Sequence, residues 1–284
     1  MKTWVETALN GPWRREHQPR LPVGVEQLVA EGIACADAGA AIVHLHAFDE
    51  NGKDDVVGDV YARIIEGIRA ERDCLVYPSI PTFAAPGVER FGHLRFLVER
   101  GLLELTVVDP GSVNLFPEND SPLPYPSLVY ANSPAEIAEG LAYCADNGVH
   151  PGFAVYEPGF TRAGAALVRA RPGVPQPIYR FMFSDDLAFG FRPGPAGIDA
   201  HLAALQTEAP GAPWLVAGLG LDVLPLVEHI VHRGGGVRTG LEDARFGCAK
   251  SNVELTRELV EAVVRAGSSP AGAAEVRAEL KGAK

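Results

Sequence analysis

Two histidines with the spacing of metal ligands, His44 and His46, close an apolar run at residues 40–43. Residues two apart on an extended strand point to the same face, so both imidazoles project together. Two imidazoles on one face can bind one divalent cation. An acidic stretch at residues 49–55 follows and is expected to form a loop, which places the pair at the carboxyl end of a strand. The pattern predicts a metal site, and the alternative is a chance pairing in a chain that has eight histidines.

An arginine and two acids near the other end of the chain could supply the third metal ligand and the acid–base groups that the histidine pair lacks. A catalytic zinc ion takes three protein ligands and keeps a fourth position open. Glu242 is expected to complete the ligand set, and Asp243 beside it to support a ligand or act as a general base. Arg238 can bind a carboxylate or carbonyl oxygen through two hydrogen bonds. The alternative is a solvated surface loop in which Glu242, Asp243 and Arg245 form ion pairs.

Alternating strand-like and helix-like segments must position these residues. Short apolar or β-branched runs predict strands at residues 3–9, 40–46, 74–79, 103–108, 152–156, 178–183, 214–217 and 236–239. Helical patterns lie between them at residues 25–38, 57–69, 88–99, 134–147, 161–169, 198–208, 221–232 and 251–266. Eight strand–helix units predict a (β/α)8 TIM barrel rather than an open sheet, in one domain spanning residues 1–284. Residues 269–284 predict an extra C-terminal helix.

This fold gives the strand ends a special importance. Active sites of TIM barrels lie at the carboxyl ends of the strands, where the following loops meet. His44 and His46 end the second predicted strand, Ser79 the third, and Asp109 follows the fourth. Glu242 follows the eighth strand, which neighbours the first in a closed barrel. We therefore expect all of these side chains at one end of the molecule.

Composition limits the classes of partner and the compartment. The net charge of −11 and the absence of a basic run argue against a nucleic-acid partner. No apolar stretch approaches 18 residues and no N-terminal signal segment is present, so we expect no membrane partner. The four cysteines lack CxxC spacing and sit in apolar segments, as buried thiols of a reducing compartment do. A cytoplasmic location is expected.

Several motifs together resemble one enzyme family. They lie at residues 18–22, 41–46, 110–114, 155–159 and 237–243, so the resemblance covers nearly the whole chain. The family is that of the β-keto acid cleavage enzymes, whose type member is 3-keto-5-aminohexanoate cleavage enzyme. The resemblance implies a zinc-dependent (β/α)8 barrel that reacts a β-keto acid with acetyl-CoA as co-substrate. The implied products are acetoacetate and a new CoA thioester.

The resemblance also implies roles for individual residues. His44, His46 and Glu242 match the ligands of one zinc ion per subunit, Asp243 matches the base, and Arg238 its polar partner. Ser79 matches a serine that contacts the substrate. Relatives are oligomers, and residues 248–259 are apolar enough to form a contact, so we expect a homotetramer.

The chain departs from the family pattern where the substrate binds. Residues 152–154 contain no carboxylate where the type enzyme has an acid that binds the substrate ammonium, and Trp13 replaces a second acid. Phe48 stands where an arginine is common. Close to Asp109, relatives usually carry an amide or hydroxyl that receives the substrate carboxylate, and Val107 and Asp109 offer less. We expect Trp13, Phe48 and Asp109 to line the substrate site. A neutral or apolar β-keto acid fits this set better than a cationic one.

Two other functions use the same residue pattern. A zinc-dependent barrel hydrolase, acting on a lactone or an amide, also opens with two histidines in this spacing. Such hydrolases usually add histidines at the ends of the fifth and sixth strands, and this chain has none there. A non-catalytic metal-binding barrel is the third hypothesis, and it requires a closed fourth coordination position.

Overall fold

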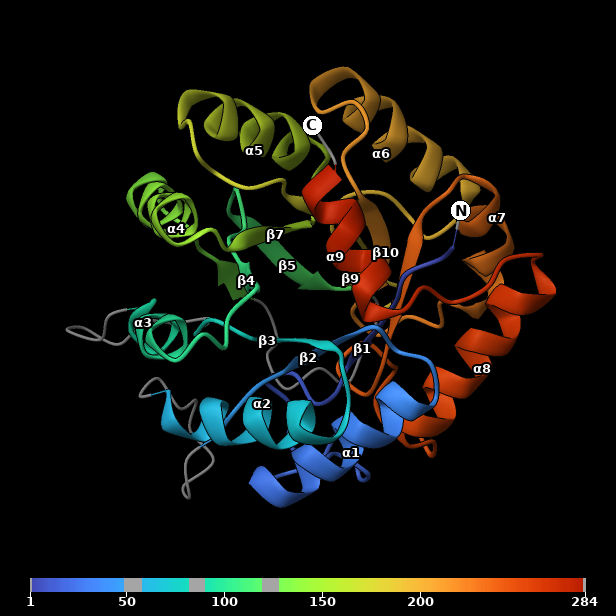
Figure 1. Cartoon of the computed structure of the whole chain (residues 1–284). Helices are drawn as coiled ribbons and strands as arrows, with labels where there is room; N and C mark the ends of the chain where they lie inside the picture. The colour runs from blue at the N-terminus through green and yellow to red at the C-terminus, as the bar shows by residue number, and fades with distance from the viewer. Residues whose placement is uncertain (1, 49–57, 82–89, 119–127, 283–284) are drawn as a thin grey trace.

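Eight parallel strands form a nearly closed barrel, seen along its axis in Figure 1. The computed structural model describes residues 2–48, 58–81, 90–118 and 128–282. The barrel strands are β1 (Val5–Ala8), β2 (Ile42–Leu45), β3 (Leu75–Pro78), β4 (Leu105–Val107), β7 (His150–Val155), β8 (Ile178–Phe183), β10 (Trp214–Gly218) and β11 (Gly236–Thr239). Their paired order is β3-β2-β1-β11-β10-β8-β7-β4. Each barrel strand therefore pairs with the barrel strand before it in the chain, except that β4 does not pair with β3, and β11 returns to β1.

A ring of helices covers the outside of the barrel (Figure 1). The ring consists of α1 (Val25–Asp37), α2 (Asp59–Glu71), α3 (Gly92–Glu99), α4 (Pro134–Asn147), α5 (Pro158–Ala170), α6 (Pro195–Glu208), α7 (Val227–His232) and α8 (Asn252–Arg265). Ser133 and Ser251 start α4 and α8 through reciprocal capping boxes with Glu136 and Glu254. The predicted loop at residues 49–55 and the first residues of the helices predicted from 57 and 88 lie outside the described residues.

Prolines explain where three predicted helix boundaries differ from the structure. Helices α5 and α6 begin at Pro158 and Pro195, three residues before the predicted starts. Proline is well suited to the first helical turn, where its missing N–H is not needed. The helix predicted at residues 221–232 is divided into a 3-10 turn, η1 (Leu224–Leu226), and α7. Pro225 sits in that turn, and the α-helix proper follows it.

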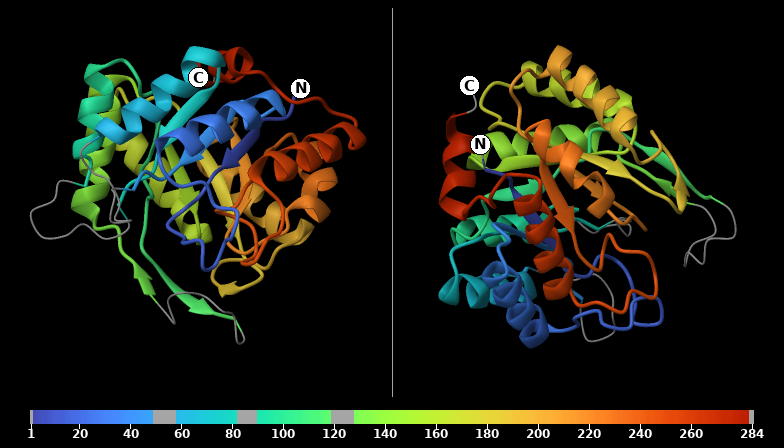
Figure 2. Two further views of the ribbon diagram at one scale, coloured as in Figure 1. Left: turned by 90° about the horizontal axis from the view of Figure 1, so that it is seen from below. Right: turned by 90° about the vertical axis from the view of Figure 1, so that its right-hand side faces the viewer.

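A small antiparallel sheet was not predicted from the sequence. It consists of β5 (Val113–Pro117), β6 (Leu128–Tyr130) and β9 (Leu187–Ala188), in the order β6-β5-β9. Its strands come from two loops, one after β4 and one after β8, in which the sequence pattern predicts no strand. Figure 2 shows this sheet projecting from the end of the barrel opposite to the N-terminus. It therefore stands at the end where the strands finish.

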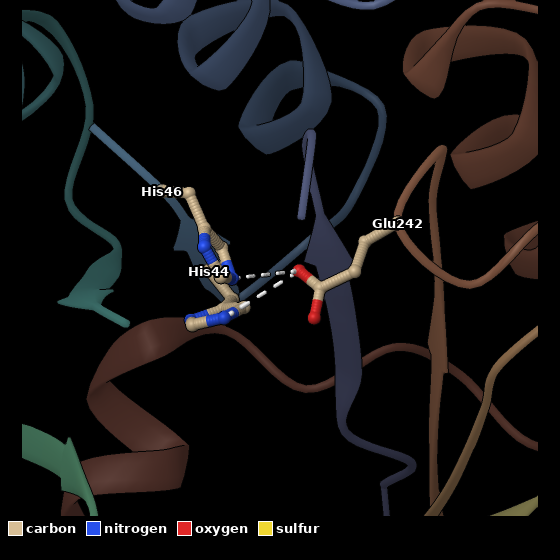
Figure 3. Close-up of side chains that lie close together, drawn as sticks. All are labelled: His44, His46 and Glu242. Carbon is tan, nitrogen blue, oxygen red and sulfur yellow. Dashed lines mark ion pairs between the residues drawn. The ribbon is translucent and has the colours of Figure 1, made fainter. Parts of the chain in front are cut away.

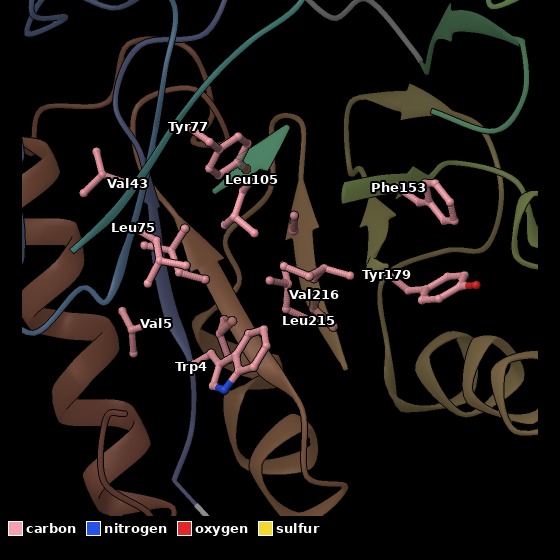
Figure 4. Packing of buried hydrophobic residues seen from close by; sticks show 14 of the residues in the cluster. Trp4, Val5, Val43, Leu75, Tyr77, Leu105, Phe153, Tyr179, Leu215 and Val216 are labelled. Atoms are coloured by element: carbon pink, nitrogen blue, oxygen red, sulfur yellow. The ribbon is translucent and has the colours of Figure 1, made fainter. Parts of the chain in front are cut away.

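The barrel core follows the alternation of side chains along each strand. On β7, Phe153 and Val155 are fully buried, whereas Gly152 and Ala154 on the other face line a cavity inside the barrel. Figure 4 shows part of the apolar packing, including Phe153 and Tyr179, whose rings meet edge to face. The apolar residues thus fill the layer between strands and helices, and the barrel interior is left free for polar groups at its carboxyl end.

The expected C-terminal helix is present as α9 (Ala273–Gly282). It lies across the amino-terminal end of the barrel, in red near the centre of Figure 1. Trp4 at the start of the chain donates from its indole nitrogen to Glu279 of this helix at 2.9 Å. Within the described part of the chain, no helix has the length and apolar character needed to cross a membrane.

Candidate active site

His44, His46 and Glu242 meet at the carboxyl end of the barrel, as predicted. The Glu242 Oε2 atom lies 3.5 Å from His44 Nε2 and 3.9 Å from His46 Nε2. Figure 3 shows the imidazole of His44 in β2 and that of His46 just after it, both facing the Glu242 carboxylate that follows β11. Strand β1 pairs with both β2 and β11, so the barrel closure itself brings these distant residues together. All three side chains are buried.

Neighbouring residues fix the position of each of these groups. Asn10 forms two hydrogen bonds of 2.8 Å with the backbone of His46, and the Tyr77 ring stacks on His44 at 4.4 Å. Gly11 has a positive φ of 59°, and a Cβ there would lie 2.6 Å from Cγ of Glu242. A glycine is therefore needed for the close approach of the loop to Glu242.

The donor set fits a zinc ion. Burial, then the nearby charges of His46 and Arg238, lower the pKa of His44 well below its usual value, so its imidazole is neutral with a free lone pair. Among the described residues, the buried Oε2 atom of Glu242 has no hydrogen-bond partner. One donor atom from each residue lies within 4.8 Å of the other two. Two imidazole nitrogens and one carboxylate oxygen form a typical catalytic zinc set.

Arg238 joins this centre to Asp243. It donates to Asp243 from Nε at 2.9 Å and from Nη2 at 2.6 Å, and Nη2 also contacts Glu242 Oε1 at 3.3 Å. Burial raises the pKa of Asp243 to about 7, although Arg238 acts to lower it. A carboxyl group with a pKa near neutrality is suited to general base chemistry. Arg238 lines the cavity described next, and Asp243 lies behind it.

A cavity of about 520 Å³ adjoins the metal centre. It brings together every predicted metal and substrate residue and Arg238. The lining includes His44, His46, Glu242, Arg238, Trp13, Phe48, Ser79 and Asp109. Much of the remaining wall is apolar, and part of it comes from Leu115 and Leu128 of the antiparallel sheet. This volume is sufficient for a small organic acid.

The structure places Trp13, Ser79 and Asp109 in different parts of this wall. Trp13 donates to the Glu242 carbonyl at 2.7 Å, which ties the first loop to the metal centre. The Ser79 hydroxyl contacts the carbonyl of Ile80 at 3.2 Å. Asp109 accepts hydrogen bonds from the Tyr130 hydroxyl and the Ala154 amide, both at 2.7 Å, and burial raises its pKa. Each Asp109 oxygen therefore already has a protein donor.

A buried polar network beneath the cavity was missed in the sequence. Glu6 is fully buried in β1 and accepts hydrogen bonds from Arg180 of β8 and from the Tyr77 hydroxyl. Arg238 Nη1 lies 3.7 Å from the same carboxylate. The sequence did contain an indication of this network, because Glu6 and Arg180 lie within strands that were predicted to be buried. A buried charge is costly unless an opposite charge pairs with it.

Comparison with known proteins agrees with this site. The profile of the family described as beta-keto acid cleavage enzyme matches residues 2–281. The chain is 25% identical over 268 residues to 3-keto-5-aminohexanoate cleavage enzyme of Acetoanaerobium sticklandii, covering 93% of this chain and 92% of that one. It is 26% identical over 276 residues to 3-oxoadipate:acetyl-CoA acetyltransferase of Cupriavidus necator, covering 94% and 90%.

Solved structures support the fold. The apo structure of ObcA superposes with a TM-score of 0.75 at 16% identity, covering 93% of this chain and 66% of ObcA. A ternary complex of ObcA with a C4-CoA adduct and oxalate gives 0.73 at 17% identity, covering 93% and 68%. At these identities the superpositions establish a shared barrel fold.

Proposed function

The chain belongs to the beta-keto acid cleavage enzyme family, and from this premise we propose that it is a zinc-dependent enzyme acting on a neutral or apolar β-keto acid. The family comprises acetyl-CoA-dependent enzymes that cleave carbon–carbon bonds and transfer acyl groups. The proposed products are acetoacetate, which takes its acetyl group from acetyl-CoA, and a CoA thioester of the remaining acyl group. The observation that carries the proposal is the buried His44, His46 and Glu242 set beside the Arg238–Asp243 pair.

The residues of the cavity divide the chemistry between them. A zinc ion held by His44, His46 and Glu242 would supply Lewis-acid polarisation of the substrate ketone. Arg238 can hold an oxygen on which negative charge develops, because its guanidinium lines the cavity. Asp243 can accept a proton at a carboxylate oxygen, directly or through the groups that Arg238 orients. Ser79 offers a hydroxyl at the wall to orient the substrate.

The cavity wall supports a neutral substrate side chain. Val107, Leu115 and Met182 contribute apolar surface, and no carboxylate stands at Gly152 or Ala154. Asp109 is the exception, but both of its oxygens already accept hydrogen bonds. An ammonium group buried here would lose its hydration without gaining a free carboxylate, at a cost on the order of several kcal/mol.

A panel of β-keto acids with acetyl-CoA tests the proposal. We expect acetoacetate and a new CoA thioester from neutral or apolar β-keto acids, and slow reaction of 3-keto-5-aminohexanoate. The control is the same protein after removal of zinc with a chelator, which should form no product. Fastest turnover of the amino substrate would contradict the proposed specificity. Hydrolysis of a lactone or amide, with no acetoacetate from any β-keto acid, would favour the hydrolase.

We also propose that the protein is a cytoplasmic homotetramer. Leu259, in the segment expected to form the contact, is fully buried in its own chain and is not available. Phe116 and Val129 on the antiparallel sheet are 52% and 56% exposed and offer apolar surface instead. Light scattering at micromolar concentration should give four times the chain mass, and a monomer mass would contradict assembly. Cell fractionation should recover the protein with cytoplasmic markers.

A further inference from the structure

Arg180 carries a guanidinium group whose Nε and Nη2 atoms bind Glu6, whereas its third nitrogen, Nη1, has no hydrogen-bond partner among the described residues. The side chain is only 3% exposed and lines the cavity. Its Nε lies 3.1 and 3.3 Å from the two Glu6 oxygens, and Nη2 lies 3.3 Å from one of them. Within the described chain, Nη1 makes no hydrogen bond. The Glu6 carboxylate thus fixes the orientation of the guanidinium and leaves one donor nitrogen toward the cavity.

Gly152 on the neighbouring strand makes this orientation possible. A Cβ atom at position 152 would lie 2.0 Å from Arg180 Nη1 and 3.1 Å from Cζ. These distances are far below van der Waals contact, so any larger residue would displace the tip of the arginine. The sequence has no acid at position 152, and in the structure the Arg180 guanidinium occupies the space that a side chain at this position would fill.

The free donor stands near the metal centre. The Tyr77 ring contacts both Arg180 and the proposed metal ligand His44. Its centroid lies 4.8 Å from Arg180 Cζ and 4.4 Å from the centroid of the stacked His44 ring. Strand β4 lies on the other side of β7 from Arg180, and of the residues there that line the cavity, Val107 has no polar group in its side chain and Asp109 is an acid, so neither side chain offers a partner for a carboxylate. Arg180, which lines the same cavity, offers the hydrogen-bond donor for a carboxylate that Val107 and Asp109 do not.

On the basis of the function proposed above, we propose that Arg180 Nη1 binds the carboxylate of the β-keto acid. This carboxylate is common to every substrate of the class, so Arg180 selects for the acid group and not for the variable side chain. Glu6 acts as its positioning residue, and Gly152 keeps the space open.

The test compares two ligands that differ by one charge. Acetoacetate and its methyl ester are titrated by calorimetry into zinc-loaded protein, and the ratio of their dissociation constants is measured. The double variant Glu6→Gln/Arg180→Gln removes both charges of the ion pair, so that neither is left unpaired. We expect it to lose roughly 10- to 100-fold of the preference for the acid, the range for a hydrogen bond to a charged group. The matched control Glu6→Gln retains Arg180 and should keep the larger part of that preference.

Metal content and a second variant exclude a purely structural effect. All proteins should bind one equivalent of zinc, so any contribution of the metal to the preference is the same in each. Gly152→Ala displaces the Arg180 guanidinium, because the new Cβ would lie 2.0 Å from Nη1, and it should weaken acetoacetate binding while the affinity for the methyl ester changes little. An unchanged preference in the double variant, or no preference in the unmodified protein, would overturn the assignment.

The outcome separates this inference from the proposed function. If the unmodified protein prefers the acid and the double variant does not, Arg180 is a carboxylate anchor even when no β-keto acid is turned over. If acetoacetate is produced but the preference is unchanged, the enzyme activity stands and the assignment of Arg180 is wrong.

Discussion

At the scale of single residues, burial determines the chemical state of the site. Desolvation keeps the imidazole of His44 neutral, and burial raises the pKa of Asp243 to about 7 despite its two hydrogen bonds to Arg238. The same residues at the surface would be a protonatable histidine and an ionised acid with ordinary pKa values. Burial inside the barrel thus makes His44 suitable as a metal ligand and Asp243 suitable as a general base.

Removal of one imidazole should release the metal. His46→Ala leaves two protein ligands, so the zinc affinity should fall by more than about 100-fold, the upper limit for loss of a supporting contact alone. Metal analysis after dialysis measures this. His229→Ala is the matched control, since His229 pairs with Asp199 on the outer helices and should leave zinc unchanged. A full equivalent of zinc in His46→Ala would remove His46 from the ligand set.

Neutralising the expected base should separate turnover from metal binding. Asp243→Asn keeps the size of the side chain and one acceptor for Arg238, but an amide cannot accept a proton. Turnover should fall by about 10²- to 10⁴-fold, while zinc content and circular dichroism stay unchanged. The measurements are kcat for acetoacetate formation and metal analysis of the same sample. Near-normal rates would show that Asp243 is not the base.

At the scale of elements, the regular parts of the fold could be predicted and the additions could not. Strands β8 and β11 have the predicted bounds. Strand β8 is an apolar and aromatic run with one arginine, and β11 contains two β-branched residues and is followed by Gly240. Strand β9 has two residues, too few for a pattern, and depends on pairing with β5 from a distant loop. Glu6 and Arg180 were missed for a related reason, since their pairing follows from the barrel closure and not from local sequence.

Helix α6 contains a histidine whose burial makes stability depend on pH. His201 is fully buried, stacks on Phe181 at 4.7 Å, and has no hydrogen bond on either ring nitrogen in the described structure. Burial lowers its pKa from 6.5 to about 4. The unfolded chain therefore binds a proton between pH 6.5 and 4 that the folded protein does not bind. The stability contributed by the neutral ring is complete above pH 6.5 and is lost as the pH falls toward 4.

The variant His201→Leu should remove this dependence. Urea unfolding of both proteins at pH 7 and pH 5 measures the effect, and the unmodified protein should lose more stability on acidification. The difference should approach about 1.4 kcal/mol per pH unit within that interval. Equal losses in the two proteins would show that His201 does not titrate as described.

At the scale of the whole molecule, the two ends of the barrel have separate tasks. The metal centre and cavity lie at the carboxyl ends of the strands, and α9 lies across the opposite end. Its contact face includes the buried residues Val276 and Leu280. Changes at α9 should therefore alter stability without altering chemistry, as is general for the amino-terminal face of this fold.

Leu280→Ala tests this separation. Loss of a fully buried leucine side chain should reduce the free energy of unfolding by about 2–5 kcal/mol. Lys281→Ala, at the exposed neighbouring position, should change it by less than about 0.5 kcal/mol. Urea unfolding gives both values. Turnover per folded molecule should be the same in both variants and in the unmodified protein, and a specific loss in Leu280→Ala would contradict the separation.

The antiparallel sheet has a consequence for how such an enzyme can acquire new substrates. Its strands β5 and β6 supply Leu115 and Leu128 to the cavity, yet they belong to loops and not to the barrel wall. Substitutions there can reshape the pocket without disturbing barrel closure or the proposed metal ligands, which come from the carboxyl end of β2, the residue after it and the loop after β11. Substrate specificity can therefore change during evolution through substitutions in this sheet, while the residues that carry out the reaction stay the same.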